Sequence, residues 1–321
     1  MRSTFIRTSA LVSLGVVLLL GSACGSSGQE DAGGDGISVV TTTPLLAEFA
    51  GRVAGEDASV SALIPRGVDL HSWQPSTGAA RDVAEADVLV VNGHNLEESL
   101  LSIVEENAGD GVPIVVASAG LDALEGGHDH EGEEADHADE QHAADDLVTA
   151  PGDPHFWLSV PNAVRYVENI RDGLAAADPD HAEGYQSRAE EFIAELQALD
   201  AEVRSTLEAI PAEARKIVVF HDAYEYLAHE YGFEVAAAVA PANPNQETSA
   251  QAIAAIVDEV RSLGVGAVYK EPQFSAQSLD LIAQETGVRV LALHSTLGDD
   301  TPTYAEMMRA NAQALVDGLA G

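Results

Sequence analysis

The histidines are the residues of this chain best suited to chemistry. Eleven occur in 321 residues, and four of them follow strand-like runs or stand at turns: His71, His155, His221 and His294. In open α/β sheets, ligands bind at the carboxyl ends of strands. A single histidine at such a place is more often a hydrogen-bonded structural residue. Several imidazoles that converge on one cleft instead indicate a metal site.

Two carboxylates stand close to these histidines in the sequence. Asp153 lies two residues before His155, and Asp222 directly follows His221. Each could accept a hydrogen bond from the second ring nitrogen of its neighbour and so fix the tautomer that binds a metal. Their alternative role is capping or turn formation, which Asp153 suits well because Pro154 follows it.

A second group of histidines lies in an acidic stretch over residues 125–146. The stretch contains ten acidic residues and no proline, and its histidines are His128, His130, His137 and His142. It has too few apolar side chains to bury a core, so we predict a solvated, mobile loop. Its imidazoles and carboxylates could hold a metal ion weakly, because binding would cost the ordering entropy of a mobile ligand set.

Composition narrows the possible functions. The chain carries 53 acidic against 15 basic residues, a formal net charge of −38. Such a field repels phosphate backbones, which argues against nucleic-acid binding, and it attracts cations. Hydrophobic residues make up 46% and charged residues 21%, as is ordinary for a globular protein. The single cysteine, Cys24, excludes a disulfide framework and any cysteine-rich zinc or iron–sulfur site.

The N-terminus is typical of a secreted lipoprotein. Arg2 and Arg7 precede an apolar run at residues 10–20, which is too short to span a bilayer. Small residues then lead to Cys24 as in a bacterial lipoprotein cleavage box, although plain secretion is the alternative. We predict a signal peptide over residues 1–23, a lipidated Cys24 and a flexible tether over 24–36. The protein would be anchored on the outer face of the cytoplasmic membrane, at a cell surface or in a periplasm.

Strand-like and helix-like runs alternate through the rest of the chain, as βαβ units require. The strand-like runs are residues 37–41, 60–64, 88–91 and 114–117, then 216–220, 235–239, 267–269 and 288–293. The helix-like runs are residues 45–54, 79–86 and 96–107, then 223–231, 249–263, 278–286 and 304–319. Thr43 and Pro44 fit the N-cap and first position of the first helix.

Between the two halves, residues 162–177 and 180–210 have helical periodicity. A helix of about 30 residues would be about 45 Å long, enough to bridge two domains. We therefore predict an α/β fold of two similar lobes, each a mostly parallel sheet with flanking helices, joined by a long rigid helix. The lobes would comprise residues 37–179 and 211–321, with the linking helix at 180–210.

Five motifs, taken in order, give the chain a family resemblance over residues 37–321. They are the runs GVDLHSWQP at 67–75, DPHFWL at 153–158, FHDAY at 220–224, YKEPQFS at 269–275 and YAEMM at 304–308. With them the chain resembles the zinc and manganese solute-binding proteins of bacterial ABC importers, in the zinc branch. The resemblance implies that His71, His155 and His221 bind the metal in a cleft between two lobes that a long helix joins.

The resemblance also implies a function without a chemical reaction. The protein would capture Zn²⁺ outside the cell and deliver it to the permease of an ABC importer. A monomer is the default expectation. Manganese members typically carry Glu at the position of His221, and neutral imidazoles suit zinc better than manganese. Many relatives have Asp where this chain has His294, so the fourth ligand is either His294, a water or a nearby carboxylate. Glu271 could stand behind the ligands or face the permease.

Three alternative functions compete with zinc delivery to a permease. A zinc hydrolase needs an open coordination position and a general base. The chain has no HExxH motif, because Phe233 stands where the second histidine would follow His229 and Glu230, and it has no GxSxG motif. A manganese or iron importer protein, and a surface adhesin or metal buffer that meets no permease, remain as alternatives. Manganese is therefore the alternative metal.

Overall fold

A computed structural model describes residues 36–109, 111–124, 148–240, 249–274 and 277–320. The predicted signal peptide, Cys24, the tether and the four histidines of the acidic stretch lie outside these residues. By internal contacts the chain divides into residues 1–33 and 34–321, and everything described here belongs to the second unit. Within the described residues, no helix combines the length and apolar character needed to cross a membrane.

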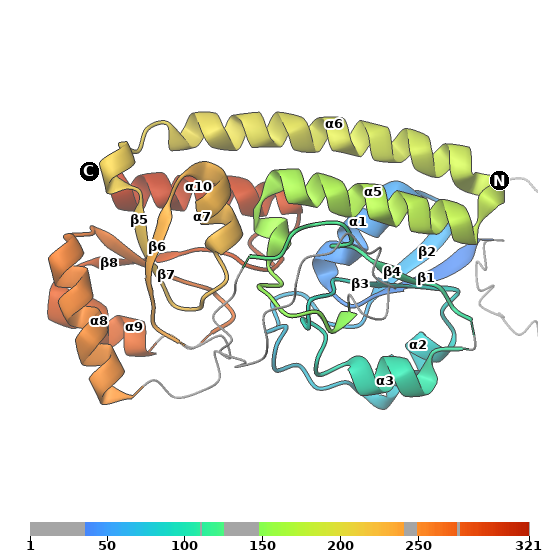
Figure 1. The fold of residues 1–321 in the computed structure, drawn as a ribbon, viewed down its shortest axis with the longest axis horizontal. Coiled ribbons are helices and arrows are strands. Elements are labelled where there is room, and N and C mark those ends of the chain that lie inside the picture. Colours follow the sequence, from blue (N-terminus) through green and yellow to red (C-terminus); the bar gives the residue numbers. More distant parts are fainter. Residues whose placement is uncertain (1–35, 110, 125–147, 241–248, 275–276, 321) are drawn as a thin grey trace, which may run out of the picture. The chain divides into compact units, whose positions relative to one another are not determined.

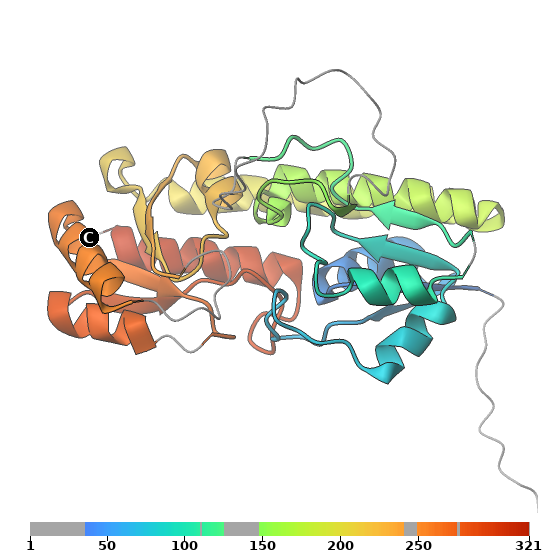
Figure 2. The ribbon, with the colours of Figure 1, turned by 60° about the horizontal axis from the view of Figure 1, so that its bottom comes forward.

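The described chain builds two four-stranded sheets with the same strand order. In the first the order is β2-β1-β3-β4 and in the second it is β6-β5-β7-β8, with every pair parallel. The strands are β1 (Ile37–Thr41), β2 (Ala58–Ala62), β3 (Val88–Val91), β4 (Ile114–Val116), β5 (Lys216–Val219), β6 (Glu234–Ala238), β7 (Ala267–Lys270) and β8 (Arg289–Ala292). This repeat confirms the predicted α/β fold of two similar lobes (Figures 1 and 2).

Helices connect the strands because parallel neighbours need crossover connections. They are α1 (Pro44–Ala54), α2 (Thr77–Ala84), α3 (Leu101–Asn107), α5 (Val160–Ala177), α6 (Ala182–Leu207), α7 (Glu225–Tyr231), α8 (Ala250–Leu263), α9 (Gln277–Thr286) and α10 (Tyr304–Leu319). Short 3₁₀ turns are η1 (Phe156–Leu158), η2 (Pro179–His181) and η3 (Ala212–Ala214). The central strand β3 reads VLVV and is buried throughout, as expected for a strand covered on both faces.

The long helix α6 contacts both lobes. It packs against α1 and α5 of the first lobe and against α10 of the second lobe (Figure 1). Its buried residues, among them Tyr185, Phe192 and Val203, recur at helical spacing and join one hydrophobic core with residues of both sheets. The helix runs for 26 residues, slightly less than the predicted span.

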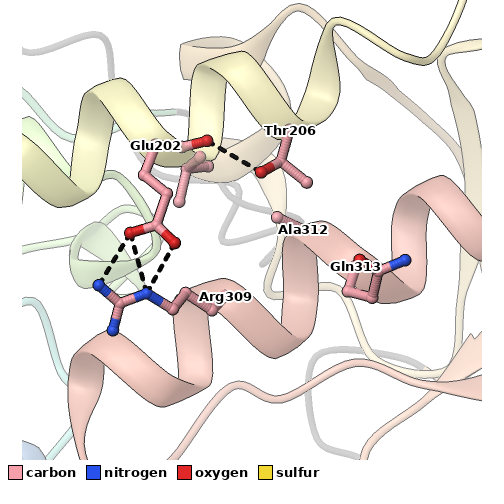
Figure 3. Close-up of a pocket in the computed structure, with 6 residues that line it drawn as sticks. Glu202, Thr206, Arg309, Ala312 and Gln313 are labelled. Atoms are coloured by element: carbon pink, nitrogen blue, oxygen red, sulfur yellow. Dashed lines mark hydrogen bonds and ion pairs between the residues drawn. The ribbon is translucent and has the colours of Figure 1, made fainter.

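A shallow pocket of about 130 Å³ lies between α6 and α10. Arg309 and Glu202 point toward each other across it (Figure 3), with Nη2 and Oε2 2.8 Å apart. The ion pair joins the second lobe to α6, and it gives the guanidinium of Arg309 a charged partner. None of the four predicted ligand histidines lines this pocket.

Alanine at two helical glycines, Gly51 and Gly173, should change the free energy of unfolding in opposite directions. In α5, a Cβ on Gly173 would overlap Cγ2 of Val115 in β4 and lie 3.0 Å from its Cγ1, whereas a Cβ on Gly51 in α1 would meet nothing within 4 Å. Alanine at Gly51 should raise the free energy of unfolding by about 0.5–1 kcal/mol, since it removes the glycine entropy penalty. Alanine at Gly173 should lower it, because overpacking costs about 1–3 kcal/mol. Urea denaturation of both variants tests this, and equal shifts would contradict it.

Candidate metal centre

Three of the four predicted histidines meet where the lobes adjoin. His71 lies in the loop after β2, His155 directly precedes η1, and His221 follows β5 by two residues. One ring nitrogen from each can be chosen so that all three lie within 4.8 Å of one another. Among the described residues, no other group of three or more His, Cys, Asp or Glu side chains meets this condition.

The three rings form a nearly regular triangle. The centroid separations are 5.4 Å between His71 and His155, 5.2 Å between His71 and His221, and 5.1 Å between His155 and His221. Nε2 of His71 lies 3.3 Å from Nε2 of His155. In a tetrahedral zinc site with Zn–N bonds of about 2.0–2.1 Å, two ligand nitrogens stand about 3.3 Å apart. The spacing of this pair is therefore that of two ligands on one zinc ion.

Asp153 holds the ring of His155. Its Oδ1 lies 2.7 Å from Nδ1 of His155 and also accepts the backbone N–H of that residue at 2.9 Å. Both residues are 4% exposed. A proton on Nδ1 then points at the carboxylate and leaves the lone pair of Nε2 for the centre of the triangle. The contact supports the role of Asp153 in orienting His155, which stays a prediction.

Glu271 plays the same part for His221. Its Oε1 lies 3.1 Å from Nδ1 of His221 and accepts the hydroxyl of Ser295 at 2.6 Å. The two residues are each 1% exposed. Nε2 of His221 has no hydrogen-bond partner among the described residues. Such a nitrogen is expected at an open ligand position, and the ring lies 5.2 and 5.1 Å from the other two imidazoles, centroid to centroid.

The sequence predicts Asp222 as the carboxylate next to His221, which stays a prediction, whereas the structure places Glu271 at Nδ1 of that ring. The signal lay in the sheet register. Val219 of β5 pairs with Tyr269 of β7, and the histidine and the glutamate each follow their paired residue by two positions. Two side chains that leave adjacent parallel strands at the same edge lie close together.

The charges around His221 counteract the effect of burial on the pKa of its imidazole. Burial alone lowers the pKa of His221, but the charge of Glu271 and its hydrogen bond, with smaller contributions from Asp222 and Asp153, outweigh this and raise the pKa above its ordinary value. The same negative charges that favour a proton on this ring also favour a bound cation. A proton and a metal ion therefore compete for this position.

His294 does not belong to the triangle. Its backbone N–H donates to Oδ1 of Asn311 at 2.7 Å, and its carbonyl accepts from Nδ2 of the same residue at 2.8 Å. The side chain is half-buried, and burial lowers its pKa. Its role as a fourth ligand stays a prediction.

Aromatic rings pack next to two of the three histidines. Trp157 packs edge-on against His155 with ring centroids 5.3 Å apart, and its Nε1 donates to the carbonyl of Ser295 at 2.8 Å. Phe274 lies 5.8 Å from the ring of His221. The indole thus joins the first lobe to the second next to the site, and it screens His155 from water.

Comparison with known proteins identifies the family of the chain. Residues 39–318 match the family described as zinc-uptake complex component A, periplasmic. The chain is 34% identical, over an alignment of 326 residues covering 98% of each chain, to the high-affinity zinc uptake system protein ZnuA of Bacillus subtilis (strain 168). It is 33% identical over 314 residues to the manganese-binding lipoprotein MntA of Halalkalibacterium halodurans, covering 95% of this chain and 96% of that one.

Solved structures share the fold. A crystal structure of ZnuA superposes with a TM-score of 0.74 and 25% identity, over 88% of this chain and 99% of that one. A Cd-bound periplasmic metal binding protein from Candidatus Liberibacter asiaticus gives a TM-score of 0.74 and 25% identity, over 88% and 98%. The chain therefore belongs to the zinc-uptake complex component A family, and it is an extracytoplasmic metal-binding component of an ABC metal uptake system.

Proposed function

We propose that this protein captures Zn²⁺ with His71, His155 and His221 and delivers it to the permease of an ABC importer. The observation that carries the proposal is the triangle of three imidazoles, two of them backed by a buried carboxylate. Neutral imidazoles suit zinc, whereas manganese prefers carboxylate and carbonyl oxygens. His294 or a water would complete the tetrahedron that zinc favours.

The proposal extends to the parts of the chain outside the described residues. Lipidation of Cys24 would hold the protein at the outer face of the membrane, next to its permease. The four histidines of the acidic stretch, His128, His130, His137 and His142, would bind additional zinc weakly and so raise its local concentration near the cleft.

A competitive titration of the metal-stripped protein with Zn²⁺ and Mn²⁺ tests the proposal. We expect one tight zinc per chain, several weaker ones, and much weaker binding of manganese. A matched variant with serine at the four loop histidines should keep the tight site and lose weak ones. Preference for manganese would overturn the zinc assignment, and loss of the tight site in the loop variant would move it out of the cleft.

The affinity for zinc should fall as the pH falls. A protonated imidazole has no lone pair for a metal, so binding is strongest above the histidine pKa and is lost as the pH drops through it. Because the pKa of His221 is raised, the loss should begin above the ordinary histidine value of about 6.5. Titrations between about pH 7.5 and about pH 5.5 measure this. Constant affinity over that range would contradict ligation by imidazoles.

A further inference from the structure

The turn that carries His155 is held by a buried side chain from each lobe. Nδ2 of Asn92, at the end of β3, donates to the carbonyl of Pro154 at 2.9 Å. The hydroxyl of Tyr226, in α7 of the second lobe, donates to the carbonyl of Asp153 at 2.8 Å. Asn92 is 1% exposed and Tyr226 is 4% exposed. The two carbonyls directly before the histidine are thus both fixed, from opposite lobes.

The amide of Asn92 has a single orientation that satisfies its neighbours. Oδ1 accepts the hydroxyl of Tyr166 at 2.5 Å, while Nδ2 faces the carbonyls of Gly93 and Pro154, which can only accept. A flipped amide would set oxygen against oxygen in the protein interior, where an unmet polar group is costly. The donor toward Pro154 is therefore fixed.

The backbone of Asn92 is anchored as firmly as its side chain. Its N–H donates to Oε1 of the buried Glu97 at 2.6 Å, and its carbonyl accepts the hydroxyl of Ser118 at 2.6 Å. Glu97 also accepts the hydroxyl of Thr42 at 2.8 Å. The ends of β1, β3 and β4 are thereby tied into one polar hub. Buried and satisfied networks of this kind specify one local geometry.

Tyr226 fixes the turn from the other lobe. Besides donating to Asp153, its hydroxyl accepts the backbone N–H of Leu124 at 3.0 Å. Its ring packs on Phe156 with centroids 4.6 Å apart. Asp153, whose carboxylate contacts the imidazole of His155, is therefore itself held through its backbone carbonyl.

We propose that Asn92 and Tyr226 are positioning residues that set His155 for zinc, an inference that rests on the proposed function. Neither side chain reaches the triangle of histidines; each acts through the turn. Metal ligands must be held to within about 0.5 Å of the productive geometry. A turn released on one side would let Nε2 of His155 move away from its 3.3 Å spacing to His71.

The test compares three variants of the full chain. Asn92→Asp places an oxygen against the Pro154 carbonyl, and Tyr226→Phe removes one hydroxyl but keeps the ring. Tyr185→Phe is the matched control, because it removes the hydroxyl of another buried tyrosine, which donates to Asp178 at 2.7 Å and contacts neither the hub nor the turn. Zinc affinity, the visible absorption of bound Co²⁺ and the urea unfolding of the metal-free protein are measured for each.

We expect Asn92→Asp and Tyr226→Phe to weaken zinc binding about 10-fold or more, the scale of a lost supporting contact, and to change the Co²⁺ spectrum. Tyr185→Phe should lower stability and leave both unchanged. Wild-type affinity in the first two variants, or an equal loss in Tyr185→Phe, would overturn the inference. If Asn92→Asp fails to fold, Tyr226→Phe alone decides. Failure of the wild-type protein to bind zinc would instead overturn the proposed function.

Discussion

Alanine in place of His221 is expected to weaken zinc binding on the order of 100-fold. A protein zinc site of four ligands has a binding free energy of about 10–16 kcal/mol, or roughly 2.5–4 kcal/mol for each ligand. Since each 1.4 kcal/mol is about tenfold in affinity, one lost ligand costs a factor of about 60 to 700. The alanine also leaves the buried carboxylate of Glu271 without its imidazole. Competitive zinc titration measures the effect.

His229→Ala is the matched control for this prediction. His229 is exposed on α7, in the same lobe, and is not one of the three clustered histidines. Its removal should leave the tight site unchanged and lower only weak surface binding. If the two variants bound zinc equally well, the cleft would not be the tight site.

The alternation of elements and several of their ends could be predicted from the sequence because the signals are local. Thr43 accepts the N–H of Leu46 as the N-cap of α1, with Pro44 following, as predicted. The start of α3 was predicted wrongly, at residue 96 instead of Leu101. His94 and Asn95 have φ of 51° and 60°, and the carboxylate of Glu97 accepts the backbone N–H of Asn92. These features turn the chain before the helix begins, and the carboxylate of Glu97 is also held by the hydroxyl of Thr42, which follows β1.

The residues around the predicted ligands show the same difference between local contacts and contacts with distant parts of the chain. Asp153 could be predicted because its carboxylate lies two residues from His155, whereas Glu271 is 50 residues from its histidine. Asn92 is 62 residues from the carbonyl that it holds. A sequence specifies which side chains can ligate a metal, but contacts across a sheet require the register of the strands. The ligands are therefore easier to predict than the residues that orient them.

Glutamine in place of Glu271 should weaken zinc binding about 10-fold, and only when His221 is present. Glutamine keeps the size of the side chain and an oxygen that can accept from Ser295, but it loses the negative charge that makes the imidazole a stronger ligand. In the His221→Ala background the same substitution should change the affinity little, because its route to the metal is gone.

A double-mutant cycle measures this coupling. The interaction free energy between Glu271 and His221 should approach the whole effect of the single glutamine substitution, about 1.4 kcal/mol for a tenfold change. Residues that contribute independently give additive effects, so an equal loss in both backgrounds would contradict a role through the imidazole. Because the carboxylate is buried next to the site, a merely structural role would lower the unfolding free energy of the metal-free protein without this coupling. Coupling in zinc affinity therefore separates orientation of a ligand from support of the core.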